Sequence, residues 1–303
     1  MFYSQGLGDF KRSTTQLAPI MRISSLIKYN RYIAHIYNAY LSFRTRHIKQ
    51  YIFVATTGRS GSTSLTNLFN EIEGCASYHE PYPVMHRDPD SEASGNPTLL
   101  GLRKIVNIKR SSIGYDYYVE TNHQFIKGFY ADVFHKLPHD KISVICLKRA
   151  AIRSALSFYS IGSIPGVTEN GKTWLLDPEN PDNVINIYTE DDTPPFLQSD
   201  FIKCLWYVYE TYARTHKIRA LNPDIRWVDM QTDELNSLDG VTRLLEQLGI
   251  PCDSKNIGRL IGIKANLKLD KKNGTIDLTE ATAMKSQFDK YLIDCGLGDY
   301  VAD

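Results

Sequence analysis

A short run of small polar residues, TTGRSGST, spans residues 56–63 and contains a single cation, Arg59. Gly58 and Gly61 allow tight turns and let the backbone approach a ligand closely. If a helix starts at the end of this run, its free amides and its positive dipole end face the same ligand. An anion such as a phosphate suits these groups, and Arg59 adds a permanent planar charge. The hydroxyl groups that can also donate to it belong to Thr57, Ser60, Ser62 and Thr63.

The run differs from the phosphate loop of nucleoside triphosphate-binding proteins in its last residues. Those loops place a lysine and then a serine or threonine directly after the second glycine, and the hydroxyl binds Mg²⁺. Here Gly61 is followed by Ser62 and Thr63 without a lysine. A phosphate group held without a metal ion is therefore the more natural ligand, and a magnesium-dependent P-loop kinase is an alternative.

Strands and helices alternate along the chain on both sides of this run. We expect strands at residues 51–55, 117–120, 142–147 and 225–230, and helices at 63–73, 99–110, 123–136, 151–159, 199–221, 237–248 and 279–294. Such alternation predicts an α/β, P-loop-type three-layer fold, in which a mostly parallel central sheet has helices on both faces. Prolines predict an irregular segment at 74–99, and Pro, Gly, Asn and Asp predict an irregular insert at about 162–200.

The position of the run relative to these elements suggests a second site residue. Ligands of parallel sheets bind beyond the carboxyl ends of the strands. The run follows the expected strand at 51–55, and Arg149 follows the expected strand at 142–147. We therefore expect Arg149 to lie near the run although the two are far apart in the sequence.

Two segments resemble a known family. TTGRSGSTSL resembles the 5′-phosphosulfate loop of sulfotransferases that use 3′-phosphoadenosine 5′-phosphosulfate (PAPS), in the arginine form found in carbohydrate, tyrosylprotein and many bacterial sulfotransferases. ICLKRAAIRSALSFY resembles the family's 3′-phosphate site, with Arg149 at a strand end and Ser157 eight residues later. Its KRAA departs from the family, which more often has proline in this turn. KLDKKNG resembles a basic loop that closes over the 3′-phosphate, which implies Lys271 and Lys272 as further ligands.

The resemblance implies a reaction and a role for further residues. A sulfuryl group would pass in line from PAPS to an acceptor hydroxyl, leaving 3′-phosphoadenosine 5′-phosphate (PAP), and no metal is required. Arg59 would stabilise the negative charge on the bridging oxygen. In the arginine branch an acid about twenty residues after the loop arginine acts as general base, and Glu80 in YHEPYP holds that position. His79 is the alternative base because histidine titrates near neutral pH. Asn122 and His123 are weaker candidates near the acceptor, and His123 also fits an ordinary surface helix.

The acceptor and the catalytic status stay open at this stage. A carbohydrate or glycolipid hydroxyl is the expected acceptor, and Trp174 is among the aromatic residues that could stack on a sugar ring. The acidic residues of the insert at 162–200 could form a lid over the site, or they could lie on a solvated loop. A PAP-binding interaction protein without turnover is the alternative from another class.

The charge of the chain is unevenly distributed. The 303 residues are 42% hydrophobic and 23% charged, with a net charge of +1, so no nucleic-acid partner is expected. Residues 1–50 hold eight Lys or Arg and one acid, which gives this part a charge of +7. We expect a basic amphipathic helical arm at 1–50 and a sulfotransferase-like domain at 51–303. The arm could contact a membrane surface, an anionic partner or a second copy of the chain.

Cysteine usage and hydropathy bear on the compartment. The five cysteines are odd in number and widely spaced, which disfavours a disulfide framework or a zinc site. The sequence shows neither a signal-peptide pattern nor an apolar stretch long enough to span a bilayer. We therefore expect a cytoplasmic protein.

Overall fold

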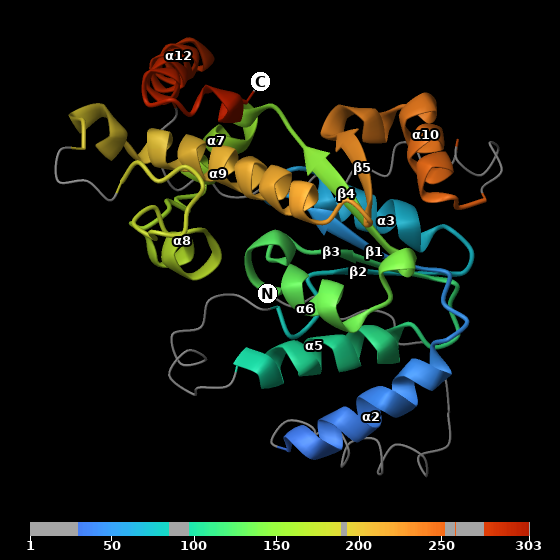
Figure 1. Cartoon of the computed structure of the whole chain (residues 1–303). Helices are drawn as coiled ribbons and strands as arrows, with labels where there is room; N and C mark the ends of the chain where they lie inside the picture. The colour runs from blue at the N-terminus through green and yellow to red at the C-terminus, as the bar shows by residue number, and fades with distance from the viewer. Residues whose placement is uncertain (1–29, 85–96, 189–192, 252–257, 259–275, 303) are drawn as a thin grey trace, which may run out of the picture.

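The fold is a five-stranded, all-parallel sheet with helices on both faces, so the predicted α/β class is confirmed. The computed structural model describes residues 30–84, 97–188, 193–251, 258 and 276–302. The strands run in the order β2-β3-β1-β4-β5 (Figure 1). Their bounds are β1 Gln50–Ala55, β2 Cys75–His79, β3 Tyr117–Thr121, β4 Ile142–Lys148 and β5 Arg226–Gln231.

The central strand β1 is buried along its whole length, as its unbroken apolar run predicts. Its neighbours end at nearly the same level, because Val54 pairs with Thr121 of β3 and Ala55 pairs with Cys146 of β4. On the far side of β3, His79 at the end of β2 pairs with the same Thr121. After β1 the chain continues to β2 and β3 on one side of the sheet, and after β4 it continues to β5 on the other side. The strand order therefore reverses between β1 and β4. Ligands of open parallel sheets bind at this point.

Helices cover both faces of the sheet (Figure 1). One face carries α3 (Ser62–Asn70) and α10 (Leu238–Leu248), whose leucines share a core with β1 and β5. The other face carries η1 (Phe125–Phe129) and α6 (Tyr130–Lys136), with α5 (Pro97–Ser111) beside them. The remaining elements are α2 Arg31–Arg44, α7 Ala151–Ser160, α8 Glu169–Trp174, α9 Asp200–Leu221, α12 Leu278–Asp294 and the 3₁₀ turns η2 His139–Lys141, η3 Pro195–Gln198, η4 Thr232–Asn236 and η5 Gly298–Tyr300.

Two local predictions differ from the structure. The segment expected to be irregular at 74–99 contains β2, a short strand at the edge of the sheet. The single helix expected at 123–136 is a π-helical turn, η1, followed by α6. Single π turns inside helices are rare and are frequent at functional sites. This one starts two residues after His123.

The insert at 162–200 is irregular apart from the short helix α8 and the 3₁₀ turn η3, and its described part is fixed to the long helix α9. Ile185 and Leu197 are fully buried in a cluster with α9 residues. The carboxylate of Glu210 accepts hydrogen bonds from the backbone amides of Val184 and Ile185, at 3.0 and 2.7 Å. The indole of Trp206 donates to the carbonyl of Ile185. These contacts fix the part of the insert around Ile185 on α9.

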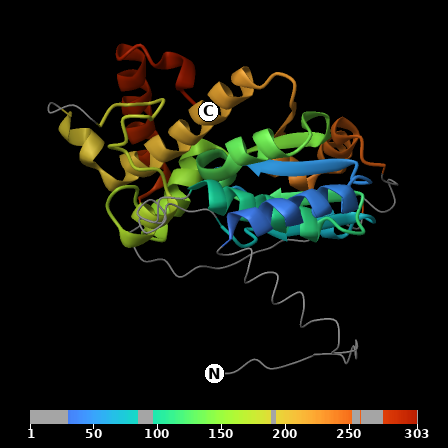
Figure 2. The same cartoon turned by 60° about the horizontal axis from the view of Figure 1, so that its bottom comes forward.

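The helix α2 is the described part of the arm expected at 1–50. Its Ala34 and Leu41 are fully buried against Leu102 and Val106 of α5. It therefore lies outside α5, at the bottom of the fold in Figure 1 and on the side that faces the viewer in Figure 2. The domain boundary at residue 50 stays a prediction. Within the described residues, the structure has no helix of the length and hydropathy needed to cross a bilayer.

Candidate functional site

A cavity of about 730 Å³ opens at the carboxyl ends of the strands. It lies where the strand order reverses, which is the place expected for the ligand of such a sheet. The loop after β1, the turn after β4 and the segment after β2 all contribute to its wall. The residues considered in the sequence that line it are Thr57, Gly58, Arg59, Gly61, Ser62, Thr63, His79, Glu80, His123, Arg149, Ser157 and Trp174.

The loop after β1 has an unusual backbone. Gly58, Arg59 and Gly61 all have positive φ angles, of 80°, 58° and 81°. For Gly61 a side chain would also clash, because a Cβ atom there would lie 3.0 Å from the Thr232 methyl group. The loop ends at α3, whose first residue is Ser62. The free backbone amides of the first turn of α3 therefore form part of the cavity wall. This geometry is that of an anion-binding loop.

The loop is held by two hydroxyl groups from other segments and by one of its own. Thr232 donates to the carbonyls of Ser60 and Lys148, at 2.8 and 2.9 Å. Tyr207 donates to the carbonyl of Thr57 at 2.7 Å. The side chain of Ser60 is fully buried and donates to the carbonyl of Gly58. Of the predicted phosphate ligands, Ser60 can therefore offer its backbone amide but not its hydroxyl.

The two predicted arginines meet at the cavity. Arg149 donates through Nη1 to the carbonyl of Arg59 at 2.9 Å, and Arg59 donates through Nε to Ser157 at 3.1 Å. Neither guanidinium forms an ion pair with a carboxylate of the described residues. Burial, and then the charge of Arg149, lower the pKa of Arg59. Because a bound anion would relieve this unfavourable charge, the pair favours an anionic ligand.

The turn that carries Arg149 lacks the proline that is common in the resembling family, and a tyrosine fixes it instead. The hydroxyl of Tyr212 on α9 accepts from the amide of Arg149 at 3.1 Å and donates to the carbonyl of the same residue at 2.9 Å. Both backbone groups of Arg149 are therefore fixed before α7 begins. Arg149 lies beside the loop, as its position after β4 predicts, and the role of Arg149 and Ser157 as phosphate ligands stays a prediction.

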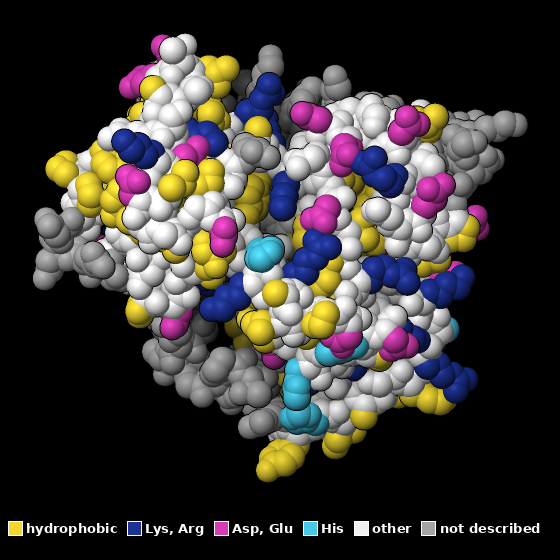
Figure 3. Space-filling model, turned by 45° about the horizontal axis from the view of Figure 1, so that its top comes forward, with side chains coloured by type: hydrophobic (Ala, Val, Ile, Leu, Met, Phe, Trp, Pro, Cys, Tyr) yellow, Lys and Arg dark blue, Asp and Glu magenta, His cyan; other side chains and the backbone are white. Residues whose placement is uncertain are grey.

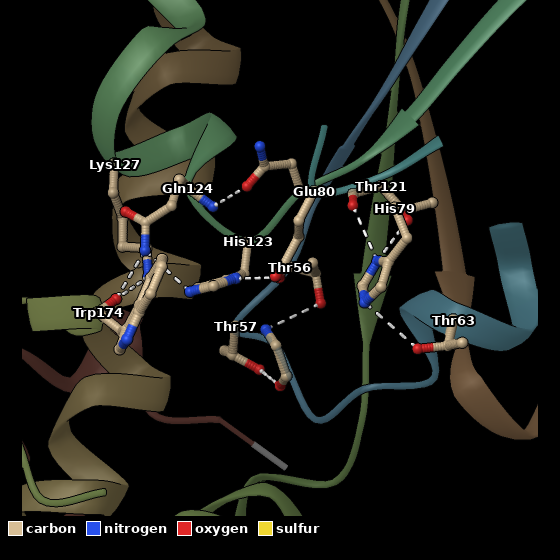
Figure 4. Close-up of polar contacts among 12 residues, drawn as sticks. Thr56, Thr57, Thr63, His79, Glu80, Thr121, His123, Gln124, Lys127 and Trp174 are labelled. Carbon is tan, nitrogen blue, oxygen red and sulfur yellow. Dashed lines mark hydrogen bonds and ion pairs between the residues drawn. The ribbon is translucent and has the colours of Figure 1, made fainter. Parts of the chain in front are cut away.

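Glu80 also has a left-handed backbone, with a φ angle of 48°. Its amide donates to the carbonyl of Thr121, and its carboxylate Oε1 lies 2.5 Å from Nδ1 of His123 (Figure 4). Burial by itself would raise the pKa of Glu80. The hydrogen bond from His123 and the nearby positive charge of Lys127 act in the opposite direction, and the pKa is lowered. Glu80 is thus a carboxylate at neutral pH.

The proton on His123 is placed by its neighbours (Figure 4). The side-chain amide of Gln124 donates to the carbonyl of Trp174 at 2.8 Å, and its nitrogen lies 2.8 Å from Nε2 of His123. Nε2 therefore accepts, and Nδ1 carries the proton that it donates to Glu80. Burial, and then the charge of Lys127, lower the pKa of His123 to about 4. His123 is thus a neutral donor and a largely buried residue, so the alternative of an ordinary surface histidine is wrong.

His79 holds two elements together rather than pointing freely into the cavity. Its Nδ1 lies 3.1 Å from the carbonyl and 3.0 Å from the hydroxyl of Thr121, and its Nε2 lies 3.4 Å from the hydroxyl of Thr63 (Figure 4). A carbonyl can only accept, so Nδ1 carries the proton and Nε2 accepts from Thr63. In this assignment Nε2, which contacts Thr63 near the start of α3, is the ring nitrogen that can accept a hydrogen bond.

The segment that carries Glu80 is anchored by a buried ion pair. Lys104 of α5 donates to the carboxylate of Glu120 at 2.5 Å and to the carbonyls of Pro81 and Pro83, at 3.1 and 3.0 Å. All three protons of the ammonium are thereby used. Asn122 donates to the same carboxylate and is itself fully buried, so it belongs to this anchor and not to the cavity wall.

Sequence reasoning missed Gln124 and Lys127, and two predicted ligands cannot be placed. Lys127 donates to the carbonyl of Trp174 and to the hydroxyl of Tyr207. No motif pointed to either residue, because their partners come from distant segments. Lys271 and Lys272 lie outside the described residues. The described residues contain no group of three metal-ligating side chains.

Two solved structures of sulfotransferases are similar to this chain. The first is a sulfotransferase domain from the curacin biosynthetic pathway, with a TM-score of 0.47 and 11% identity over 80% of this chain and 98% of that one. The second is the mouse sulfotransferase SULT7A1 complexed with PAP, with a TM-score of 0.45 and 10% identity over 84% of this chain and 88% of that one. The sequence matches no protein-family model and no curated protein.

Proposed function

We propose that the protein is a sulfotransferase that moves a sulfuryl group from PAPS to an acceptor hydroxyl. One observation carries the proposal. Arg59 and Glu80 are the two non-glycine residues with positive φ in the described chain, and both line the cavity. Such strained backbone concentrates at functional sites. The sequence motifs had selected the same two residues as the charge stabiliser and the base.

The anion-binding groups divide between the two phosphates of the donor. The donor supplies an SO₃ group attached to a phosphate oxygen. Arg59 and the amides at the start of α3 would bind that phosphosulfate and stabilise the charge that develops on its bridging oxygen. Arg149 and Ser157, on the other side of Arg59, would bind the 3′-phosphate. These groups fit the donor because two guanidiniums share one cavity without a carboxylate partner among the described residues.

Glu80 would take the proton of the acceptor hydroxyl. Its carboxylate lines the cavity, and the hydrogen bond from His123 fixes one of its oxygens while the other can accept. Nε2 of His123 is engaged by Gln124, so His123 cannot accept a second proton without breaking that bond. The proton therefore stays on Glu80, and His123 is a positioning residue.

A carbohydrate or glycolipid is the acceptor class that we favour. The cavity lining also includes Trp174, Phe158 and Leu175, and aromatic side chains of this kind pack well against a sugar ring. The carbonyl of Trp174 is fixed by Gln124 and Lys127, which holds the indole near the ring of His123 at a centroid distance of 6.1 Å. A PAP-binding protein without turnover would not need the hydrogen bonds from Gln124 to His123 and from His123 to Glu80 that fix the carboxylate.

The cysteines support a proposal about the compartment. Cys146, Cys204 and Cys295 are free thiols in the structure. Burial raises the pKa of Cys146 to about 12, so this thiol is unreactive. Three free thiols fit a reducing compartment, and we propose the cytoplasm.

The proposal is tested by transfer of labelled sulfate. Wild-type protein, incubated with ³⁵S-labelled PAPS and glycan, glycolipid and protein fractions from the source organism, should label a carbohydrate-containing fraction with EDTA present. PAP should raise the melting temperature under the same metal-free conditions. Stabilisation by magnesium-ATP but not by PAP would support the kinase alternative instead. PAP binding without labelling of any fraction would support the non-catalytic alternative.

The pH dependence of transfer should distinguish Glu80 from a histidine base. Because the pKa of Glu80 is lowered, the wild-type rate should stay level as pH falls through 6.5 and decline only below the usual glutamate range. In His123→Phe the lowering hydrogen bond is lost while burial remains, so this decline should begin at higher pH. Initial rates between pH 4 and 8 for both proteins measure it. A wild-type rate that already falls near pH 6.5 would contradict Glu80 as the base.

A further inference from the structure

The helix α2 has a second apolar face, opposite the one that packs on the protein. Ala34 and Leu41 are buried against α5. On the other side Tyr32, Ile36, Tyr40 and Phe43 are 83, 72, 48 and 61% exposed. Their spacing of four, four and three residues places them in one stripe along the helix. We call these four residues the α2 stripe. An ordinary surface helix carries polar residues on its outer face, so this stripe marks an interaction surface.

The charges on α2 and on the sequence that flanks it have a single sign. Residues 10–70 contain no Asp or Glu. Arg44 donates to the hydroxyl of Tyr40 at 2.7 Å, and the guanidinium of Arg46 lies 4.6 Å from the ring centroid of Phe43. Both arginines are exposed. By contrast, the face shown in Figure 3 has Lys and Arg side chains interspersed with Asp and Glu.

We propose that the α2 stripe docks on the surface of an anionic lipid bilayer, with α2 parallel to the membrane plane. A helix with aromatic and aliphatic residues on one side and arginines beside them is typical of such binding. Tyrosine rings settle at the boundary between acyl chains and headgroups, and arginines bind lipid phosphates. The helix is already folded and fixed to α5, so binding costs it no folding entropy.

Charge argues against the two other occupants of this surface. A second copy docked through the same stripe would bring Arg44 and Arg46 near their equivalents, with no acid on either helix to pair with them. The segment at residues 1–29 of the same chain is also basic, with four Lys or Arg and one Asp. An anionic surface is the partner that both the apolar and the charged residues favour.

The proposed docking surface is separate from the candidate active site. None of the residues that line the cavity belongs to α2. The inference therefore does not depend on the proposed sulfotransferase activity. Substitutions in the α2 stripe should leave ligand binding at the cavity and the melting temperature unchanged.

Co-sedimentation of the full chain with vesicles tests the proposal. Wild-type protein should sediment with vesicles of phosphatidylcholine and phosphatidylserine, should stay in solution with pure phosphatidylcholine, and should be released by high salt. The double variant Ile36→Glu, Phe43→Glu should lose at least about tenfold in partitioning. Leu221→Glu, at the end of α9, is the matched control because Leu221 is 71% exposed, and it should bind like the wild type.

Three outcomes would overturn the proposal. The first is wild-type protein that stays in solution with anionic vesicles. The second is a double variant that sediments as well as the wild type, which would place lipid binding elsewhere in the chain. The third is a wild-type dimer in light scattering that the double variant dissociates, without vesicle binding by either, which would assign the α2 stripe to a second copy.

Discussion

Replacing Glu80 by glutamine should lower the rate of sulfuryl transfer by about 10²–10⁴-fold, the usual contribution of a general base. The substitution is nearly isosteric, and the glutamine oxygen can still accept the hydrogen bond from Nδ1 of His123. The amide of residue 80 still donates to Thr121, so the strained turn keeps its anchor. What the variant loses is the ability to take a proton. The loss should therefore appear in kcat, with PAP affinity unchanged.

Two further variants separate the alternatives for the base. Glu73→Gln removes an exposed carboxylate at the other end of β2, away from the cavity, and should leave transfer unchanged. His79→Asn removes the competing base, and the asparagine can still reach neighbouring hydroxyl groups, so transfer should fall much less than in Glu80→Gln. If Glu80→Gln kept full activity, Glu80 would have only an ordering role. If His79→Asn alone abolished transfer, the base would be His79.

The strands, and the proximity of Arg149 to the loop after β1, were predictable because their signals are local. An unbroken apolar run such as residues 51–55 has few uses other than a buried parallel strand, and β1 has that burial. Once β1 and β4 are adjacent, the geometry of a parallel sheet brings Arg59 and Arg149 to the same edge. The structure confirms this proximity with a hydrogen bond between them.

The edge strand β2 and the hydrogen bonds that fix Glu80 were not predictable, because the residues on which they depend are distant in the sequence. β2 is short, follows a turn and precedes several prolines, and it forms because the edge of β3 offers it hydrogen bonds. The tautomer of His123 depends on Gln124, whose orientation depends on the carbonyl of Trp174, fifty residues away. That carbonyl is in place only because the insert packs on α9. The acidic residues of the insert were the candidates for a lid. In the structure the insert contacts the site through the backbone carbonyl of Trp174.

Replacing Arg149 by alanine should weaken PAP binding by about 2–5 kcal/mol, the cost of removing one partner of a hydrogen-bonded charge pair. This corresponds to a loss of about 30-fold or more in Kd. The variant also loses the hydrogen bond from Nη1 to the carbonyl of Arg59, which helps to hold that residue at its positive φ. Calorimetric titration with PAP measures the loss. Arg153→Ala is the matched control, because Arg153 is exposed on the next turn of α7 and carries the same charge.

A second ligand shows which phosphate Arg149 binds. Adenosine 5′-monophosphate lacks the 3′-phosphate of PAP and should bind wild-type protein and Arg149→Ala equally weakly. The affinities of the two proteins for the two ligands form a double-mutant-type cycle. We expect the coupling free energy between the Arg149 side chain and the 3′-phosphate to account for most of the lost PAP affinity. If the variant weakened both ligands equally, Arg149 would act through the position of Arg59 and the loop. In that case Ser157→Ala, which removes the hydroxyl that accepts from Nε of Arg59, should weaken both ligands as well.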